Sequence, residues 1–341
     1  MIYSEFERGV YMKRFLSLLI AVMMALSMVP VISFAAEVRT VYLDPTAGSD
    51  ANNGLSEAAP VKTVTAAYGT LSGADEGRII MLSTLNLTAE TTLPACSIPV
   101  TITSKTGTEG IQSSKNILFG GDTTLEDMTI TMNAASNSMF LSAEGHNLTI
   151  GKNVITKAYK SGSTSYYFCI TGSFYADNVD GMHMTVKSGT WRNIYAAAYK
   201  EAVTGDVTLT VTGGTVPNNI APCYSGTVKG NVEMFISGVN AQTNICGTPG
   251  GGSGANVTGN VTINLGDHIT ASNIKVTKQA SGKVTGKVTV IADGDLSNVK
   301  NIIHGSSTGT AGSTELILRS GVLACDPCAF DKVTVDVPVR L

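Results

Sequence analysis

The chain has 341 residues, 14% of them charged, and a formal net charge of −3. This near balance, without any block of basic residues, gives no electrostatic footprint for nucleic acid. No stretch after residue 35 approaches the roughly 18 consecutive apolar residues that span a bilayer, so we expect no transmembrane segment in the mature chain. Gly, Thr, Val, Ser and Asn recur throughout. Because these residues favour half-buried strands and tight turns, the composition predicts an all-β protein.

Residues 1–35 have the pattern of a secretory signal peptide with an upstream extension. Met12-Lys13-Arg14 supplies a positive start, Phe15 to Val31 is apolar, and Ser33-Phe34-Ala35 places small residues where a signal peptidase cuts. A membrane-anchoring helix is the rival interpretation, and the small residues at its end argue against it. We expect residues 36–341 to form one mature domain that is secreted or held at the cell surface.

The mature chain opens with an extended stretch and a polar loop, and residues 41–63 read VYLDPTAGSDANNGLSEAAPVKT. This stretch resembles the entry segment of secreted right-handed parallel β-helix proteins of the pectate-lyase-like superfamily. The resemblance implies an all-β right-handed parallel β-helix solenoid with a short N-terminal helical cap. It places the entry and cap at about residues 36–77, the capping helix at Thr65 to Leu71 and the first strand at Arg78 to Leu82. Because that superfamily includes lyases, hydrolases, epimerases, phage tailspikes and adhesins, the resemblance concerns the fold rather than the chemistry.

Three residues of the entry loop, Asp44, Asp50 and Asn52, carry side-chain oxygens. Asp and Asn commonly accept hydrogen bonds from their own turn backbone, which is the structural interpretation. The alternative is a site for Ca²⁺, a hard cation that binds about six to eight oxygens. The sequence firmly implies no cofactor, and Ca²⁺ is the candidate considered for this loop.

A repeat becomes regular at Gly181 and extends over residues 181–311. Its units open with GMHMTV, GDVTLTV, GNVEMFI, GNVTINL and GKVTVIA, at intervals of 24, 25, 29 and 27 residues. Each opening alternates as a short strand does, so that Val207, Leu209 and Val211 share one face. We therefore expect coils of about 25 residues, each pairing in register with the next. Less regular coils precede the repeat, with strands at Val100–Thr103, Met128–Met132 and Asn147–Ile150, and two strands at Leu316–Leu318 and Val333–Val339 follow it.

Each regular unit also carries a glycine corner followed by Asn and a β-branched residue. Stacked asparagines can hydrogen-bond to one another, so this position predicts a structural ladder. The ladder consists of Asn193, Asn219, Asn244, Asn273 and Asn298. Asn116-Ile117 and Asn153-Val154 repeat the same step upstream.

We name no catalytic residue from the sequence. Alignment on the glycine corner makes Asp267 and Asp295 neighbours, with Asp293 and His268 close by. Adjacent carboxylates raise one pKa and can hold a proton or a metal ion, but acidic residues beside glycine are also ordinary turn formers. Cys325 and Cys328 have the spacing of a redox or zinc motif, and a local disulfide or two inert thiols are the alternatives.

Aromatic residues gather in one part of the chain, where ten of them lie between residues 159 and 224. Flat rings stack on sugars and supply large contact areas, although they also fill cores. The candidates for ligand binding are Tyr166, Tyr167, Trp191, Tyr195 and Tyr199. His183, Lys187 and Arg192 form a basic patch in the same coils, without a carboxylate set beside them.

These observations favour an adhesin-like, non-catalytic β-helix that binds a polysaccharide or a surface glycoprotein along its side wall. The alternative is a carbohydrate-active enzyme, either a polysaccharide lyase or a glycoside hydrolase, with the three aspartates Asp267, Asp293 and Asp295 as its active site. The sequence does not identify the ligand or the oligomeric state.

Overall fold

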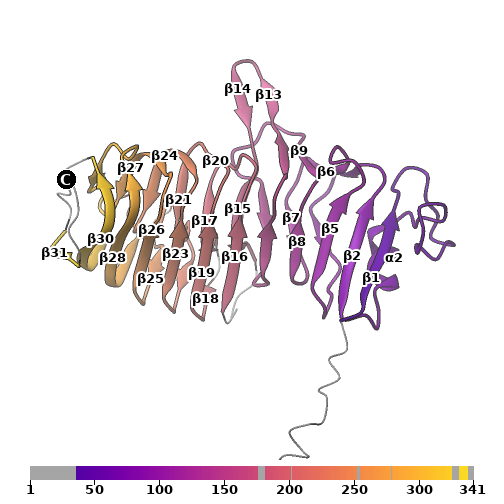
Figure 1. The fold of residues 1–341 in the computed structure, drawn as a ribbon, viewed down its shortest axis with the longest axis horizontal. Coiled ribbons are helices and arrows are strands. Elements are labelled where there is room, and N and C mark those ends of the chain that lie inside the picture. The colour runs from indigo at the N-terminus through magenta and orange to yellow at the C-terminus, as the bar shows by residue number, and fades with distance from the viewer. Residues whose placement is uncertain are drawn as a thin grey trace, which may run out of the picture. The chain divides into compact units, whose positions relative to one another are not determined.

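The computed structural model describes residues 36–175, 181–200, 202–251, 254–277, 279–324 and 330–336. The predicted signal peptide and the Cys325/Cys328 motif lie outside these residues. The compact unit Val38–Leu341 is an all-β parallel β-solenoid of about nine turns, which confirms the fold expected from the repeat. Figure 1 shows its strands lying side by side.

Most strands belong to three parallel sheets. The first sheet contains β1 (Val38–Leu43), β2 (Glu76–Met81), β5 (Val100–Ser104), β8 (Thr123–Leu125), β11 (Leu148–Ile150), β16 (Met182–Val186), β18 (Ala202–Val203), β19 (Val207–Val211), β22 (Thr227–Val228), β23 (Val232–Ile236), β25 (Asn256–Val257), β26 (Val261–Leu265), β28 (Lys283–Leu296), β30 (Thr310–Leu323) and β31 (Lys332–Val335). The second sheet contains β4 (Thr91–Leu93), β7 (Ile117–Phe119), β10 (Phe140–Ser142), β15 (Cys169–Ser173), β17 (Ile194–Ala198), β20 (Thr215–Val216), β21 (Asn219–Ala221), β24 (Asn240–Cys246), β27 (Thr270–Lys275) and β29 (Ile302–Ile303). The third sheet contains β3 (Leu85–Leu87), β6 (Gly110–Ser113), β9 (Thr129–Met132) and β12 (Ile155–Lys157).

The five predicted repeat openings are β16, β19, β23, β26 and the middle of β28. They pair in parallel with equivalent residues opposite one another, so that Val207 faces Val232 and Val232 faces Val261. The alternation holds as expected: Val207, Leu209 and Val211 are buried, while Thr208 and Thr210 between them are half-buried on the outer face.

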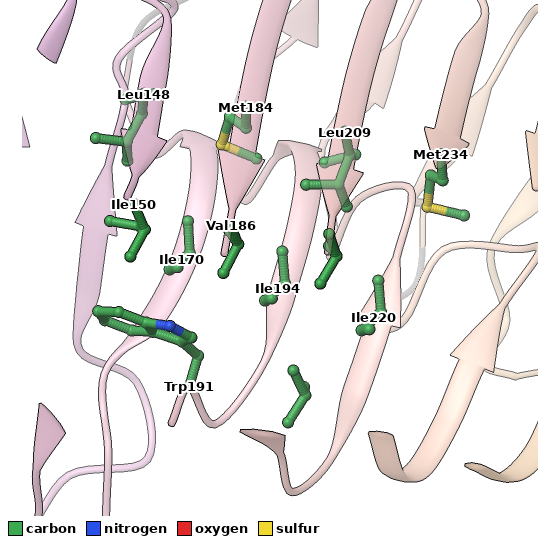
Figure 2. Packing of buried hydrophobic residues seen from close by; sticks show 14 of the residues in the cluster. Leu148, Ile150, Ile170, Met184, Val186, Trp191, Ile194, Leu209, Ile220 and Met234 are labelled. Carbon is green, nitrogen blue, oxygen red and sulfur yellow. The ribbon is translucent and has the colours of Figure 1, made fainter. Parts of the chain in front are cut away.

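The core consists of like residues stacked between the sheets. One column of the second sheet runs through Leu141, Ile170, Ile194, Ile220 and Ile245, all fully buried. Figure 2 shows several of these side chains facing buried residues of the first sheet. Burial of each such side chain contributes roughly 1.5–3 kcal/mol, and the pairing of neighbouring coils satisfies the backbone groups between them.

The entry segment folds much as expected. Thr63 caps helix α2 (Val64–Thr70), and its side chain accepts a hydrogen bond from the Ala66 backbone N–H. Ala67, Tyr68 and Leu71 are buried and join the solenoid core, which fits the expected capping role. Among the described residues, no helix combines the length and the hydrophobicity needed to cross a membrane.

A β-hairpin interrupts the coil pattern after β12. Strands β13 (Tyr159–Ser161) and β14 (Thr164–Tyr166) pair antiparallel and project from the stack (Figure 1). The turn between them contains Gly162 with a φ of 58°, a left-handed conformation that glycine adopts without strain. This hairpin was not predictable from the sequence, because two strands of three residues each are too short to show an alternating pattern.

Candidate functional site

The Asp44 and Asp50 carboxylates of the entry loop accept hydrogen bonds from protein groups, mostly within the loop. The Asp50 carboxylate accepts hydrogen bonds from the backbone N–H groups of Lys62 and Thr63 at 2.9 and 2.8 Å and from the Thr63 hydroxyl at 2.8 Å. These bonds, chiefly the one from the Thr63 N–H, lower the pKa of Asp50. Asp44 accepts from Thr46, Ala47 and Ser83, and the Asn52 side-chain amide donates to the Pro60 carbonyl at 2.8 Å. The geometry therefore favours the structural interpretation of this loop over a Ca²⁺ site.

The three aspartates at the opposite end also bond to protein groups: Asp267 follows strand β26, and Asp293 and Asp295 belong to strand β28. Asp267 and Asp295 are neighbours, but the Asp267 carboxylate accepts a hydrogen bond from the Asp295 backbone N–H at 2.7 Å. The backbone N–H of Ser297 bonds the Asp295 carboxylate and lowers its pKa, which corrects the expectation that stacking raises it. Asp293 accepts from the Ser320 hydroxyl at 2.6 Å. Within the described ranges, no three His, Cys, Asp or Glu side chains are placed to hold a metal ion.

Trp191 does not face the solvent, contrary to its selection as a ligand-binding candidate. The side chain is fully buried and packs among the core residues that Figure 2 labels. Its indole N–H donates to the Ser188 carbonyl at 2.8 Å, so that its polar atom is satisfied inside the solenoid. Trp191 precedes the strand β17, at a corner where the sequence shows no alternation, and this explains why its direction was not predictable.

Of the other four aromatic candidates, Tyr195 is also buried, at 3% exposure, whereas Tyr166, Tyr167 and Tyr199 are half-buried. Tyr166 belongs to the hairpin and contacts Tyr159, with ring centroids 6.4 Å apart. Tyr167 follows the hairpin and is half-buried. Tyr195 and Tyr199 belong to a second apolar cluster, separate from the core. Tyr199 stacks on Phe174 at 4.9 Å and on Tyr224 at 4.6 Å, with nearly parallel planes in both pairs.

The asparagine ladder forms, with one change of member. Asn244 donates from Nδ2 to Oδ1 of Asn219 at 2.8 Å and accepts from Nδ2 of Asn273 at 3.1 Å. The next partner is Asn301, whose Nδ2 lies 3.3 Å from Asn273 Oδ1, whereas the expected Asn298 is exposed and does not join.

The fifth unit contains Asn followed by a β-branched residue twice, which explains the wrong choice of Asn298. Ile274 pairs with Ile302, and this register sets Asn301 beside Asn273. At the other end of the ladder, the Asn193 side-chain oxygen accepts from the Asn219 backbone N–H, and the Asn193 amide donates to the Cys169 sulfur at 3.4 Å.

The structure contains a second ladder, which was not predicted from the sequence. In the second, third and fourth units the residue after the opening glycine is Asp206, Asn231 or Asn260, and each of these side chains accepts a hydrogen bond from the backbone of the next coil. The Asn231 N–H donates to Asp206 Oδ1 at 2.7 Å, and the Asn260 N–H donates to Asn231 Oδ1 at 2.9 Å. The signal was present in the Gly-Asp/Asn-Val openings of the repeat. This ladder orders the turns before β23 and β26 and the backbone at Lys287 in β28.

A groove of about 240 Å³ lies where the asparagine ladder meets the aromatic cluster. We call it the Tyr–Asn groove. Its lining consists of Asn137, Ser138, Phe140, Cys169, Arg192, Asn193, Tyr195, Tyr199, Asn218, Asn219, Tyr224 and Gly250. The side chains come from successive coils of the second sheet and its corners, so the groove crosses several coils.

A second hollow of about 340 Å³ shares Arg192 with the groove. Its lining includes Tyr167, Thr190, Gln242 and, from the hairpin, Ser165. Arg192 is half-buried, and its guanidinium forms no ion pair with any described residue. An unpaired guanidinium between two hollows is a ready partner for a carboxylate or a sulfate.

The chemistry of the groove is that of hydrogen bonding and charge recognition. The described residues that line the two hollows include no carboxylate and no imidazole. Burial raises the pKa of the Tyr195 and Tyr199 phenols and raises the pKa of the Cys169 thiol to about 11. These groups therefore remain protonated near neutral pH and are poorly suited to act as general bases.

No protein-family model matches the chain, and no curated protein or solved structure is similar to it at a significant level. The function of the chain therefore has to be inferred from the chemistry of the site itself.

Proposed function

We propose that this protein is an exported, non-catalytic β-helix that binds glycans in the Tyr–Asn groove. The observation that carries the proposal is the lining of that groove, which combines tyrosines, side-chain amides and Arg192 without a carboxylate or a histidine among its described residues. Amides and protonated phenols match the donors and acceptors of sugar hydroxyls. The leader pattern at Met12 to Ala35 supports export.

Arg192 gives the proposed ligand a chemical class. Because its guanidinium lacks an ion-pair partner among the described residues, a ligand with carboxylate or sulfate groups gains a charge-assisted hydrogen bond that a neutral glycan does not. We therefore propose that the groove prefers acidic glycans, such as chains of uronic acids or of sulfated sugars.

A glycan array with neutral, uronate-containing and sulfated oligosaccharides tests the proposal. We expect the acidic members to be retained and the Arg192→Met variant to bind them about tenfold to hundredfold more weakly. Arg192→Lys keeps the charge but loses the planar fork, so it should recover part of the affinity. Lys300→Met is the matched control, because it removes one positive charge from an exposed position that lines neither hollow.

Assays for reducing sugars and for unsaturated products, run on the same polysaccharides, test the absence of catalysis. We expect no turnover above that of buffer. Turnover that the Asp267→Ala substitution abolishes would contradict the non-catalytic proposal and restore the enzymatic alternative.

A further inference from the structure

A third hollow lies on the outer face of the first sheet and uses none of the groove residues. It has a volume of about 300 Å³, and its lining includes Phe235, Asn264, Ile291, Asp293 and Arg319. Phe235 pairs with Asn264, and Asn264 pairs with Ile291, so these three residues occupy one outward column on adjacent strands. Adjacent strands are about 4.8 Å apart, which sets Phe235 and Ile291 roughly 10 Å apart across Asn264.

The Phe235 ring differs from the rings of the groove. It is 40% exposed and has no ring or cation contact with any described residue. Tyr199, by contrast, has Phe174 on one face and Tyr224 on the other. A sugar therefore cannot stack on Tyr199 without breaking a ring pair, whereas Phe235 retains surface for such a contact.

The polar side chains of this hollow are held in place by neighbouring coils. Asn264 Nδ2 donates to Glu233 Oε1 at 3.1 Å, and the Ser320 hydroxyl donates to Asp293 Oδ1 at 2.6 Å. Arg319 Nε lies 3.6 Å from Asp336 Oδ2. The two hydrogen bonds orient Asn264 and Asp293, and the ion pair places an acidic partner near Arg319. Further oxygens and N–H groups of each side chain remain available to a ligand.

From this geometry we propose that the hollow around Phe235 is a second, independent glycan contact that takes one pyranose ring of a neutral polysaccharide. The apolar face of the sugar packs on Phe235, and its hydroxyl groups bond Asn264, Asp293 and Arg319. A neutral ligand fits because the lining carries one carboxylate and one guanidinium, and this guanidinium, unlike that of Arg192, has an acidic partner in Asp336. The inference shares with the proposed function only the assumption that the ligand is a glycan.

The test is a titration of the Arg192→Met variant with xylohexaose, cellohexaose and mannohexaose, in which NMR chemical shifts report binding. The Arg192→Met substitution is present so that the Tyr–Asn groove does not contribute. We expect at least one of the three to bind, and Phe235→Ala to weaken that binding about tenfold. Phe235→Tyr should retain binding because it keeps the ring. Val322→Ala is the matched control, since Val322 is also 40% exposed and lies outside the hollow.

Two results would overturn the inference: no binding of any of the three oligosaccharides at millimolar concentration, or equal binding by the Phe235→Ala variant. A second titration, of acidic glycans into the Phe235→Ala variant with Arg192 intact, tests the Tyr–Asn groove alone. It therefore distinguishes a failure of this inference from a failure of the proposed function. Their binding should be unchanged, and its loss would mean that the two contacts are not independent. Circular dichroism of each variant checks that the fold is preserved, which we expect because Phe235 projects outward.

Discussion

Replacement of Asn244 by alanine should reveal how much the asparagine ladder contributes to stability. The Asn244 side chain is 4% exposed and makes two hydrogen bonds, one to Asn219 at 2.8 Å and one from Asn273 at 3.1 Å. A net hydrogen bond is worth roughly 1 kcal/mol, and a buried group left without its partner costs about 1–3 kcal/mol. We therefore expect Asn244→Ala to lower the free energy of unfolding by about 2–3 kcal/mol.

Urea unfolding followed by circular dichroism measures this effect, and hydrogen exchange at the amides of β21, β24 and β27 shows whether the loss is local, as expected for stacked coils. Asn298→Ala is the control, because Asn298 is exposed and lies outside the ladder. Its expected effect is within about 0.5 kcal/mol. The assignment of the ladder would be refuted if Asn244→Ala left the free energy of unfolding unchanged. It would also be refuted if Asn298→Ala lowered that free energy as much as Asn244→Ala does.

Three further predictions concern single side chains. Trp191→Ala should cost about 3–5 kcal/mol of unfolding free energy in urea titrations, and the emission of Trp191, the single Trp, should not change when glycan saturates the protein. Burial raises the pKa of Tyr195, so the contribution of the protonated phenol to folding stability should be fully present below about pH 10. That contribution should decline as the pH rises toward the pKa of Tyr195 in the folded state. Ultraviolet absorbance of the phenolate measures this ionisation. Hydrogen bonds from Lys287 and Lys332 lower the pKa of Glu315 to about 2. The contribution of Glu315 to folding stability should therefore be present above about pH 4.3 and be lost as the pH falls toward 2. An NMR titration should show that Lys287→Gln raises the pKa of Glu315.

The repeat made most of the solenoid predictable. Alternating apolar residues at fixed intervals determine which faces stack, and the register of Val207, Val232 and Val261 follows from them directly. The hairpin at Tyr159–Tyr166 could not be predicted, because its strands are short and have no counterpart in the other coils.

The candidate site was predictable only in part. Tyr195 and Tyr199 were selected as aromatic candidates and do line the groove, but the direction of Trp191 depends on a corner conformation that no periodicity encodes. Arg192 was visible only as a member of a basic patch. Its position between two hollows results from the meeting of separate coils and the hairpin, and this information is absent from any local stretch of sequence.

The uniform register has a consequence for how such a binding surface can change. Met182 pairs with Val207, and Val207 pairs with Val232, so removal of the coil at residues 205–229 would let β16 meet β23 in the same alignment. The same deletion would take away Asn219 and Tyr224 and shorten the groove by one strand spacing, about 4.8 Å. Gain or loss of whole coils thus offers a route to match the length of the binding surface to the length of a ligand in discrete steps, without redesign of the core.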